Sequence, residues 1–504
     1  MMHFCQKLRL VLVASCFFIC CFASAQLRLP ALVGDHMVLQ QNANVTLWGW
    51  SAPNKKIQIQ VGWQAEALET AADNSGNWSV DVATVTAGGP YSIKISGEDS
   101  IELQDVMLGE VWLCSGQSNM FFPLGKDARS SWRTGIIDSE KEIAQAQLPN
   151  LRLFTVATAA AQEPLLDVKG HWQRCTPETA ADFSAVAYFF GRDLLEDLEV
   201  PVGLISSSWG GTKVESWMQK EVLEQHPDFQ PILDREELKQ HAYKQALAAY
   251  NSAQQAGTTP PEKPKKAEAN KAPYVLYNAM IHPLLNYKIK GAIWYQGESN
   301  ADRAYQYRSL FPAMVKNWRD LWGQGDFPFY YVQIAPHHGQ TPEIREAQLL
   351  ALNRIPNSGM VVSADHGNPK DIHPRNKKPI GKRLASWALA NTYSKNIAFS
   401  GPLYDHYLIK DAVIEIYFKH SNGLNIKGDA LKDLEIAGAD GVFYKAEAQI
   451  ENDHLVVFST AVEQPKAVRF GWKNSPEVLL FNAHGLPASP FRTDDWPQPT
   501  MHKL

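Results

Sequence analysis

Cysteine is scarce in this 504-residue chain. Four of its six cysteines fall within the first 25 residues, which leaves only Cys114 and Cys175 in the bulk of the sequence. Two cysteines allow one disulfide and exclude a disulfide framework. Because Cys114 ends an apolar stretch, we expect it to be a packed thiol. The remaining chain has no paired cysteines and no His-x-x-x-His spacing, so the sequence predicts no metal site.

Long apolar runs and an excess of basic residues are also lacking. The formal charge of −5 argues against a nucleic-acid partner. The one long apolar run, residues 10–22, is too short to span a bilayer comfortably; it follows two basic residues and precedes Ala23-Ser24-Ala25. Residues 1–25 are therefore predicted to be a signal peptide, which predicts an exported, periplasmic or secreted chain without a membrane span. A lipoprotein site at Cys16 is ranked second.

Short β-strands are predicted at both ends of the remaining chain. Residues 26–105 form an N-terminal β-sandwich-like domain, because turn residues separate the strand candidates 45–50, 57–61, 78–82 and 91–95. Residues 401–504 form a C-terminal β-rich region with the strand candidates 412–418, 442–444, 454–458 and 467–472. This second region is either a third domain or pairs with the first.

The centre of the chain, residues 106–400, repeats a pattern of strand, loop and helix. Five units of this kind predict an α/β fold with a doubly wound parallel sheet and helices on both faces. The strand candidates are 111–114, 202–205, 291–295, 329–334 and 359–363. A polar stretch at about residues 219–272, helical at first and then linker-like, is interpreted as an insertion.

A small polar turn that contains Ser118 follows the first of these central strands. In open α/β sheets, ligands bind at the edge where the carboxyl ends of the strands lie. A serine hydroxyl held at that edge can attack a substrate, so Ser118 is the candidate nucleophile. The alternative is that Ser118 only caps the segment that follows it.

Two other strands end in residues that suit an oxyanion hole. Gly210 and Gly211 follow the second strand, and paired glycines let a backbone N–H approach a ligand closely. Gln296 and Asn300 follow the third strand, and their amides can donate to a developing oxyanion. Either feature alone has an ordinary explanation, such as a tight turn, but both occur at the same predicted sheet edge as Ser118.

The loop after the fifth strand contains a candidate base. His373 can accept the proton of a serine hydroxyl when a carboxylate orients its ring. Asp365 and Asp371 both precede it. We favour Asp365, because a strand end can hold a carboxylate rigidly, whereas Asp371 would have to fold back sharply to reach the ring. A lone loop histidine is more often structural, so the interpretation depends on the serine, glycines and amides at the same edge.

At these positions the chain resembles the SGNH hydrolases and, within them, the sialate O-acetylesterase family. The resemblance lies in the stretches 109–120, 201–212, 277–284, 294–300, 345–348 and 372–377. It implies that Ser118 is the nucleophile and His373 the base, with Gly211 favoured over Gly210 and Gln296 over Asn300 as oxyanion donors. The sequence departs from the usual SGNH pattern in two places. Other SGNH enzymes usually have Gly-x-Asn-Asp in the third block, whereas here Gly297 is followed by Glu298, Ser299 and Asn300. An aspartate usually stands three residues before the base, whereas here Lys370 precedes His373 by three residues.

The resemblance implies a serine carbohydrate O-acetylesterase that forms an acyl-enzyme and needs no metal or organic cofactor. O-acetyl sialic acid is the first expected substrate, and acetylated xylan or another hemicellulose is the alternative. The 15 tryptophans keep open a carbohydrate-binding protein with a vestigial esterase site. A lipase-like enzyme would instead need a long apolar pocket. The sequence predicts no oligomeric state.

Overall fold

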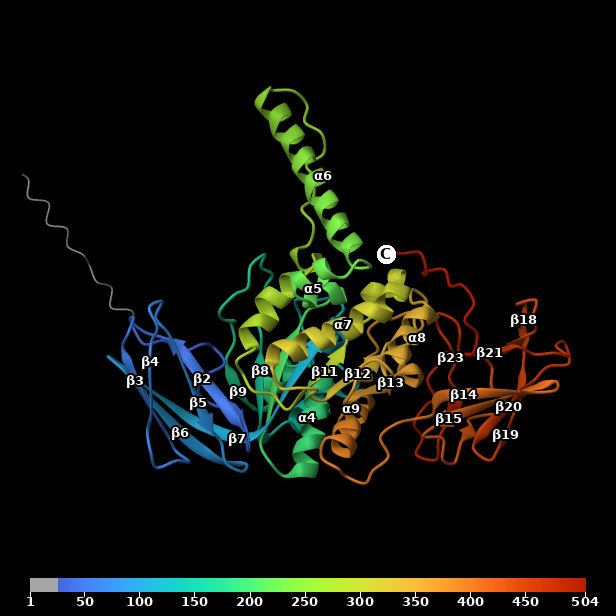
Figure 1. Cartoon of the computed structure of the whole chain (residues 1–504), viewed down its shortest axis with the longest axis horizontal. Coiled ribbons are helices and arrows are strands. Elements are labelled where there is room, and N and C mark those ends of the chain that lie inside the picture. Colours follow the sequence, from blue (N-terminus) through green and yellow to red (C-terminus); the bar gives the residue numbers. More distant parts are fainter. Residues whose placement is uncertain (1–25) are drawn as a thin grey trace, which may run out of the picture.

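A central α/β region lies between two β-regions in the computed structural model, which describes residues 26–504 (Figure 1). The predicted signal peptide lies outside the described residues. Within residues 26–504, no helix is long and apolar enough to cross a membrane. Cys114 and Cys175 are both buried and free, so Cys114 is a packed thiol as expected.

The strand β7 (Ser100–Gly116) lies at the centre of the main sheet, which has the order β13-β12-β11-β7-β10-β8-β9. All neighbours in this series are parallel except β8 and β9. The strands that follow β7 in the chain lie on both sides of it, with β10 next to it on one side and β11 on the other. The strand order therefore reverses at β7, and the carboxyl end of β7 is the topological switch point. The other bounds are β8 (Leu148–Thr155), β9 (Trp172–Cys175), β10 (Val202–Ser208), β11 (Gly291–Tyr295), β12 (Phe329–Gln333) and β13 (Ser358–Val362).

Helices cover both faces of this sheet, so the predicted doubly wound α/β fold is confirmed. On one face, Trp112 of β7 packs edge-to-face against Phe190 of α4 (Ala185–Leu198), next to α9 (Lys378–Asn391). On the other face, Trp294 of β11 packs against Trp318 of α7 (Ala304–Trp322), beside α8 (Pro342–Ala351). Successive side chains of each strand point to opposite faces of the sheet, so each strand contributes apolar residues to the hydrophobic core on either face. The sequence reasoning missed β8 and β9.

The predicted boundary at residue 105 falls inside β7, which therefore belongs to two sheets at once. Its first half pairs with β6 (Gly88–Ser96) and its second half with β10 and β11. Burial changes along it from alternating to continuous, as expected for a strand that passes from a half-exposed antiparallel sheet into a covered parallel one. The remaining N-terminal strands are β1 (Val38–Gln40), β2 (Asn44–Trp50), β3 (Lys56–Val61), β4 (Leu68–Ala71) and β5 (Asn77–Ala83).

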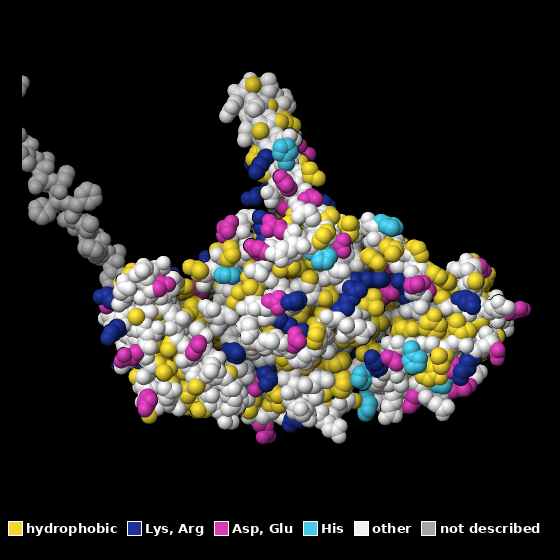
Figure 2. Space-filling view, in the orientation of Figure 1, with side chains coloured by type: hydrophobic (Ala, Val, Ile, Leu, Met, Phe, Trp, Pro, Cys, Tyr) yellow, Lys and Arg dark blue, Asp and Glu magenta, His cyan; other side chains and the backbone are white. Residues whose placement is uncertain are grey.

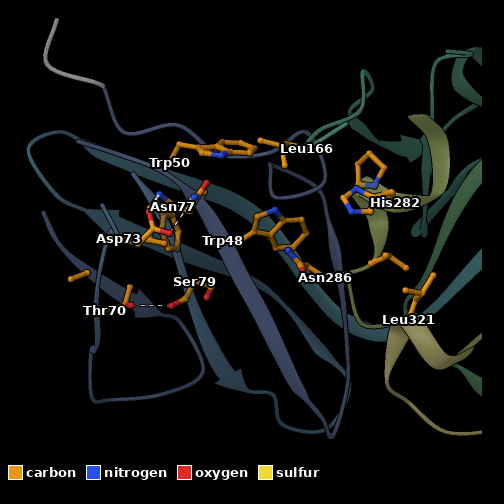
Figure 3. Close-up of a pocket in the computed structure, with 15 residues that line it drawn as sticks. Trp48, Trp50, Thr70, Asp73, Asn77, Ser79, Leu166, His282, Asn286 and Leu321 are labelled. Atoms are coloured by element: carbon orange, nitrogen blue, oxygen red, sulfur yellow. Dashed lines mark hydrogen bonds between the residues drawn. The ribbon is translucent and has the colours of Figure 1, made fainter. Parts of the chain in front are cut away.

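A cleft of about 650 Å³ separates the N-terminal β-region from the central region. Figure 3 shows Trp48 and Trp50 of β2 on one side of it and His282 and Leu321 on the other. Asp73, at the same cleft, accepts hydrogen bonds from the backbone and side chain of Asn77 and shapes the turn before β5. The Asp73 carboxylate in the lining of this cleft is therefore already hydrogen-bonded to another residue of the protein.

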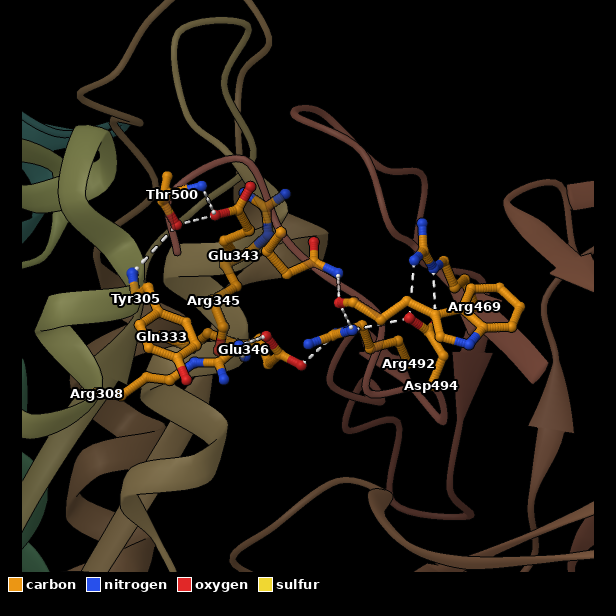
Figure 4. Close-up of polar contacts among 12 residues, drawn as sticks. Tyr305, Arg308, Gln333, Glu343, Arg345, Glu346, Arg469, Arg492, Asp494 and Thr500 are labelled. Carbon is orange, nitrogen blue, oxygen red and sulfur yellow. Dashed lines mark hydrogen bonds and ion pairs between the residues drawn. The ribbon is translucent and has the colours of Figure 1, made fainter. Parts of the chain in front are cut away.

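The C-terminal β-region lies at the opposite end of the molecule from the N-terminal one and shares no sheet with it (Figure 1). A buried polar cluster joins it to α8. Glu346 accepts hydrogen bonds from Arg308 and Arg492, and Arg492 also pairs with Asp494 (Figure 4). Its strands are β14 (Leu403–Lys410), β15 (Val413–Lys419), β16 (Asn425–Ile426), β17 (Leu434–Ala437), β18 (Phe443–Lys445), β19 (Glu447–Glu451), β20 (His454–Phe458), β21 (Ala467–Phe470), β22 (Leu480–Phe481) and β23 (Phe491–Arg492).

The insertion forms α5 (Lys220–Gln225) and α6 (Gln230–Gln255), and α6 stands out from the body (Figure 1). Ile232 is the buried residue of α6. On the face seen in Figure 2, the lower part of the projecting hairpin carries both acidic and basic side chains, and its tip is mostly uncharged. The chain then returns through residues 256–268 to the cavity described below. Short helices at that cavity and elsewhere are α1 (Ser118–Phe121), α2 (Ser139–Ala144), α3 (Pro177–Ala181) and the 3₁₀ helix η5 (Glu298–Arg303).

Candidate active site

Ser118 lies at the switch point of the sheet, as the first residue of α1. The turn before it requires glycine, because a Cβ at Gly116 would lie 2.2 Å from the carbonyl oxygen of Tyr295 and because φ at Gly116 is +141°. Ser118 is 7% exposed and lines a cavity of about 980 Å³. Its backbone N–H starts a helix and so lies outside the intrahelical hydrogen-bond ladder.

The same cavity is lined by Gly210, Gly211 and His373, so the structure brings together residues from three loops that the sequence singled out. A Cβ built on Gly210 would lie 3.3 Å from the Cβ of Ser118, whereas one on Gly211 would meet only the Lys271 side chain, at 3.9 Å. Gly210 is therefore the glycine packed against the serine. Gly211 provides the positive φ, +70°, that turns the chain away.

His373 stacks on Trp132, with ring centroids 4.5 Å apart, at the wall of the cavity. Within residues 26–504 neither of its ring nitrogens has a hydrogen-bond partner, and no hydrogen bond joins it to Ser118; such bonds are often long before substrate binds. Burial and then the Lys377 ammonium lower the pKa of His373 to about 4. At neutral pH its ring is unprotonated and can accept a proton.

The two candidate acids have different partners. Asp365, which we favoured from its position at a strand end, directs both carboxylate oxygens to Arg383 of α9, at 2.7 and 2.6 Å. Asp371 instead accepts a hydrogen bond from the backbone N–H of His373 at 2.9 Å, and its charge acts to raise the pKa of the ring. The position of α9 decides this difference, because it brings a guanidinium to the strand end. Asp371 is thus the acid that faces His373.

The amides of Gln296 and Asn300 are buried and engaged inside the protein. Gln296 Nε2 donates to the Thr212 carbonyl at 3.2 Å and to Asn300 Oδ1 at 2.7 Å. Asn300 Nδ2 donates in turn to the buried Glu215, which pairs with Arg303. Both residues connect the loops behind the cavity, and neither lines it. The sequence reasoning recognised their chemistry but could not see where their hydrogen bonds go.

Gln117, which the sequence reasoning passed over, is the amide that lines the cavity beside Ser118. Its Oε1 accepts the Ser299 backbone N–H at 3.4 Å, which leaves Nε2 without a partner among the described residues. An amide N–H so placed can donate to an oxyanion. The signal that could have revealed it was its position next to the nucleophile, in the same polar turn.

Charged side chains form part of the cavity wall. Arg129 and Arg133 both pair with Asp127, so that two guanidinium groups share one carboxylate. Arg133 is half-buried and packs over the Phe121 ring, and its buried Nε has no hydrogen-bond partner among the described residues. These three side chains carry one net positive charge, and Lys271, Glu268 and Glu298 are the other charged residues of the lining. No group of three or more His, Cys, Asp or Glu that could hold a metal ion occurs in residues 26–504.

A family model described as carbohydrate esterase, sialic acid-specific acetylesterase, matches residues 108–260 and 265–390. The chain belongs to this family. Sialate O-acetylesterases of Mus musculus and Homo sapiens are each 30% identical to it; the match covers 75% of this chain in both cases, and 75% and 73% of the respective relatives. The crystal structure of a carbohydrate acetylesterase from Xanthomonas citri is 34% identical, with a TM-score of 0.80, and the match covers 94% of this chain and 100% of that one.

Membership of the sialic acid-specific acetylesterase family confirms the resemblance predicted from the sequence. The chain is a carboxylic ester hydrolase of the carbohydrate esterase class. The matched residues include the turn of Ser118, the glycine pair, the Gln296 loop and the loop of His373. All residues described around the cavity thus lie within the part of the chain that defines the family.

Proposed function

We propose that this esterase removes O-acetyl groups from sugars, with O-acetyl sialic acid as its substrate, through an acetyl-enzyme formed on Ser118. The observation that carries the proposal is the convergence of Ser118, His373 and Gly210 on one cavity at the switch point of the sheet. A nucleophile, a base and close-approaching backbone N–H groups are the parts that acyl transfer requires.

In the proposed mechanism His373 takes the Ser118 proton while the hydroxyl oxygen attacks the acetyl carbonyl carbon. The Ser118 and Gly210 N–H groups and the Gln117 amide stabilise the oxyanion. His373 then protonates the departing sugar hydroxyl, and water attacks the acetyl-enzyme to release acetate. Asp371, held against the backbone of His373, is the proposed acid, in place of Asp365.

The Arg133 guanidinium at the cavity favours an acidic sugar over a neutral one. Sialic acid has a carboxylate, whereas the backbone of xylan has no charge. The Arg133 guanidinium, which is oriented by Asp127 and is 14% exposed, lines the cavity and can pair with such a carboxylate. Trp132 and Trp209 line the same cavity and offer rings against which a sugar can pack. This charge is the reason to rank acetyl xylan second.

Acetate release from O-acetyl sialic acid, measured beside release from acetyl xylan, tests the substrate. We expect a kcat/KM higher by at least about tenfold for the sialate, which corresponds to one charge-assisted hydrogen bond. A higher kcat/KM for acetyl xylan would indicate that the enzyme is a hemicellulose esterase. Activity on neither substrate, with none on a generic acetyl ester, would instead favour the carbohydrate-binding alternative.

Replacing Arg133 separates recognition of the carboxylate from the chemical step. We expect Arg133→Met to raise KM for O-acetyl sialic acid roughly 10- to 100-fold, because a hydrogen bond between charged groups is lost. Turnover of the neutral ester 4-nitrophenyl acetate should change little. Arg129→Met is the matched control, since Arg129 is 79% exposed and pairs with the same carboxylate. An equal loss on both esters would contradict a role in recognition.

Asp371 and Asp365 give opposite expected results when each is changed to asparagine. Asp371→Asn should lower kcat, because the charge that faces His373 is removed. Asp365→Asn should chiefly lower the melting temperature, because it disrupts the two-point pair with Arg383. Steady-state kinetics and thermal unfolding of both variants check this. A larger kcat loss for Asp365→Asn than for Asp371→Asn would restore Asp365 as the orienting acid.

A further inference from the structure

Three buried polar side chains at the cavity belong to different loops and have no role in the mechanism above; Glu298 lines the cavity, and the other two do not. Asn119 directly follows the nucleophile, Glu298 starts η5, and Lys377 precedes α9. Asn119 is 0% exposed and Lys377 is 1% exposed. A buried lysine at the start of a helix is unfavourable both for desolvation and for its interaction with the helix dipole. Residues that break local rules in this way are often functional.

The amide of Asn119 joins all three loops. Its Nδ2 donates to Glu298 Oε1 at 2.6 Å and to the carbonyl of Ile372 at 3.0 Å, and its Oδ1 accepts from Lys377 Nζ. Ile372 immediately precedes His373, so the turn of the nucleophile and the loop of the base share one side chain. An aspartate at this position could not donate both bonds, and a leucine could make none of the three.

The charges around the base are unevenly distributed. Lys377 and, more weakly, His337 act against protonation of His373, while Asp371 acts in its favour. Lys377 itself faces Glu298 and Asp371, and its ammonium lies over the rings of Phe122 and Tyr295. The Phe122 ring, 5.1 Å from that ammonium, also faces the His373 ring, with centroids 6.5 Å apart, so the cation is fixed in a buried site close to the imidazole.

We propose that Lys377, fixed by Asn119, is a positioning residue that keeps His373 free of a proton in mildly acidic solution and so extends the esterase's activity to low pH. This inference rests on the proposed role of His373 as the base. Burial lowers the pKa of Lys377 to about 7. Below that pH the ammonium is charged, and it repels a proton from His373 over the range where an ordinary histidine would become protonated. Lys377 therefore carries its charge throughout the pH range in which an ordinary histidine would take up a proton.

The acid limb of kcat/KM tests the proposal. A base must be unprotonated to work, so the wild-type limb is expected near the pKa of His373, at about 4. Lys377→Met should move this limb upward by about one pH unit, because a nearby like charge is removed. Lys377→Arg keeps the charge and should keep the limb in place. Acetate release from a neutral acetyl ester between pH 3 and 8 measures all three proteins.

An unchanged limb in folded Lys377→Met would overturn the proposal. It would also fail if Lys377→Arg moved the limb as far as Lys377→Met, since packing and not charge would then be the cause. NMR titration of the wild-type His373 ring, assigned against the spectrum of His373→Gln, requires neither variant of Lys377 to fold. A ring that titrates near 6.5 would refute the proposal. Because this titration needs no turnover, its result is independent of whether Ser118 is the nucleophile.

Discussion

Ser118→Ala and His373→Ala are each expected to lower kcat by several orders of magnitude while the protein stays folded. A nucleophile and its base act together in the chemical step, so removing either one removes most of the rate that the pair provides. Neither side chain makes a hydrogen bond in the described chain, so neither substitution leaves a buried partner unpaired. Acetate release under saturating substrate, with thermal unfolding as the check on folding, measures the effect.

Ser115→Ala is the matched control. Ser115 lies in β7, three residues before the nucleophile, is fully buried, and its hydroxyl has no hydrogen-bond partner. We expect near wild-type activity from this variant. Retention of a tenth of the wild-type rate in purified Ser118→Ala or His373→Ala would refute the assignment of that residue.

Gln117→Ala is expected to lower kcat by roughly 10²- to 10³-fold with little change in KM. The amide would stabilise a charge that develops only in the transition state, and removing one such donor typically has this effect. A rise in KM at constant kcat would instead make Gln117 a substrate-binding group. Steady-state kinetics with a neutral acetyl ester distinguishes the two results, because such an ester makes no contact that depends on the sugar.

Gln296→Leu provides the contrast. It leaves the carbonyl of Thr212 without its donor, at a cost of about 1–3 kcal/mol for this buried group, and removes one of the two donors of Asn300 Oδ1, which keeps the Val214 N–H. The melting temperature should therefore fall, and the kcat loss of the folded fraction should be smaller than for Gln117→Ala. The reverse order of kcat losses would return the oxyanion role to Gln296, as the sequence first suggested.

The fold was predictable because the physical signal for it is local. A buried parallel strand needs a short apolar run, and a helix on the sheet needs apolar residues at helical spacing. β10, β11, β12 and β13 were found in this way. β8 was missed because Pro149 and Arg152 interrupt its apolar pattern. The length of β7 was missed because its first half alternates like an edge strand while its second half is apolar throughout.

The sequence by itself determined the family, the α/β class and the three loops that meet at the cavity, because strands that end at one sheet edge bring their loops together. Only the tertiary structure decided which amide lines that cavity, which glycine packs against Ser118 and which acid is bound elsewhere. Gln117 lines the cavity, whereas Gln296 is turned toward Thr212. Asp365 is occupied because α9 returns with Arg383. Such choices depend on contacts between loops far apart in the chain, about which local patterns of residues contain no information.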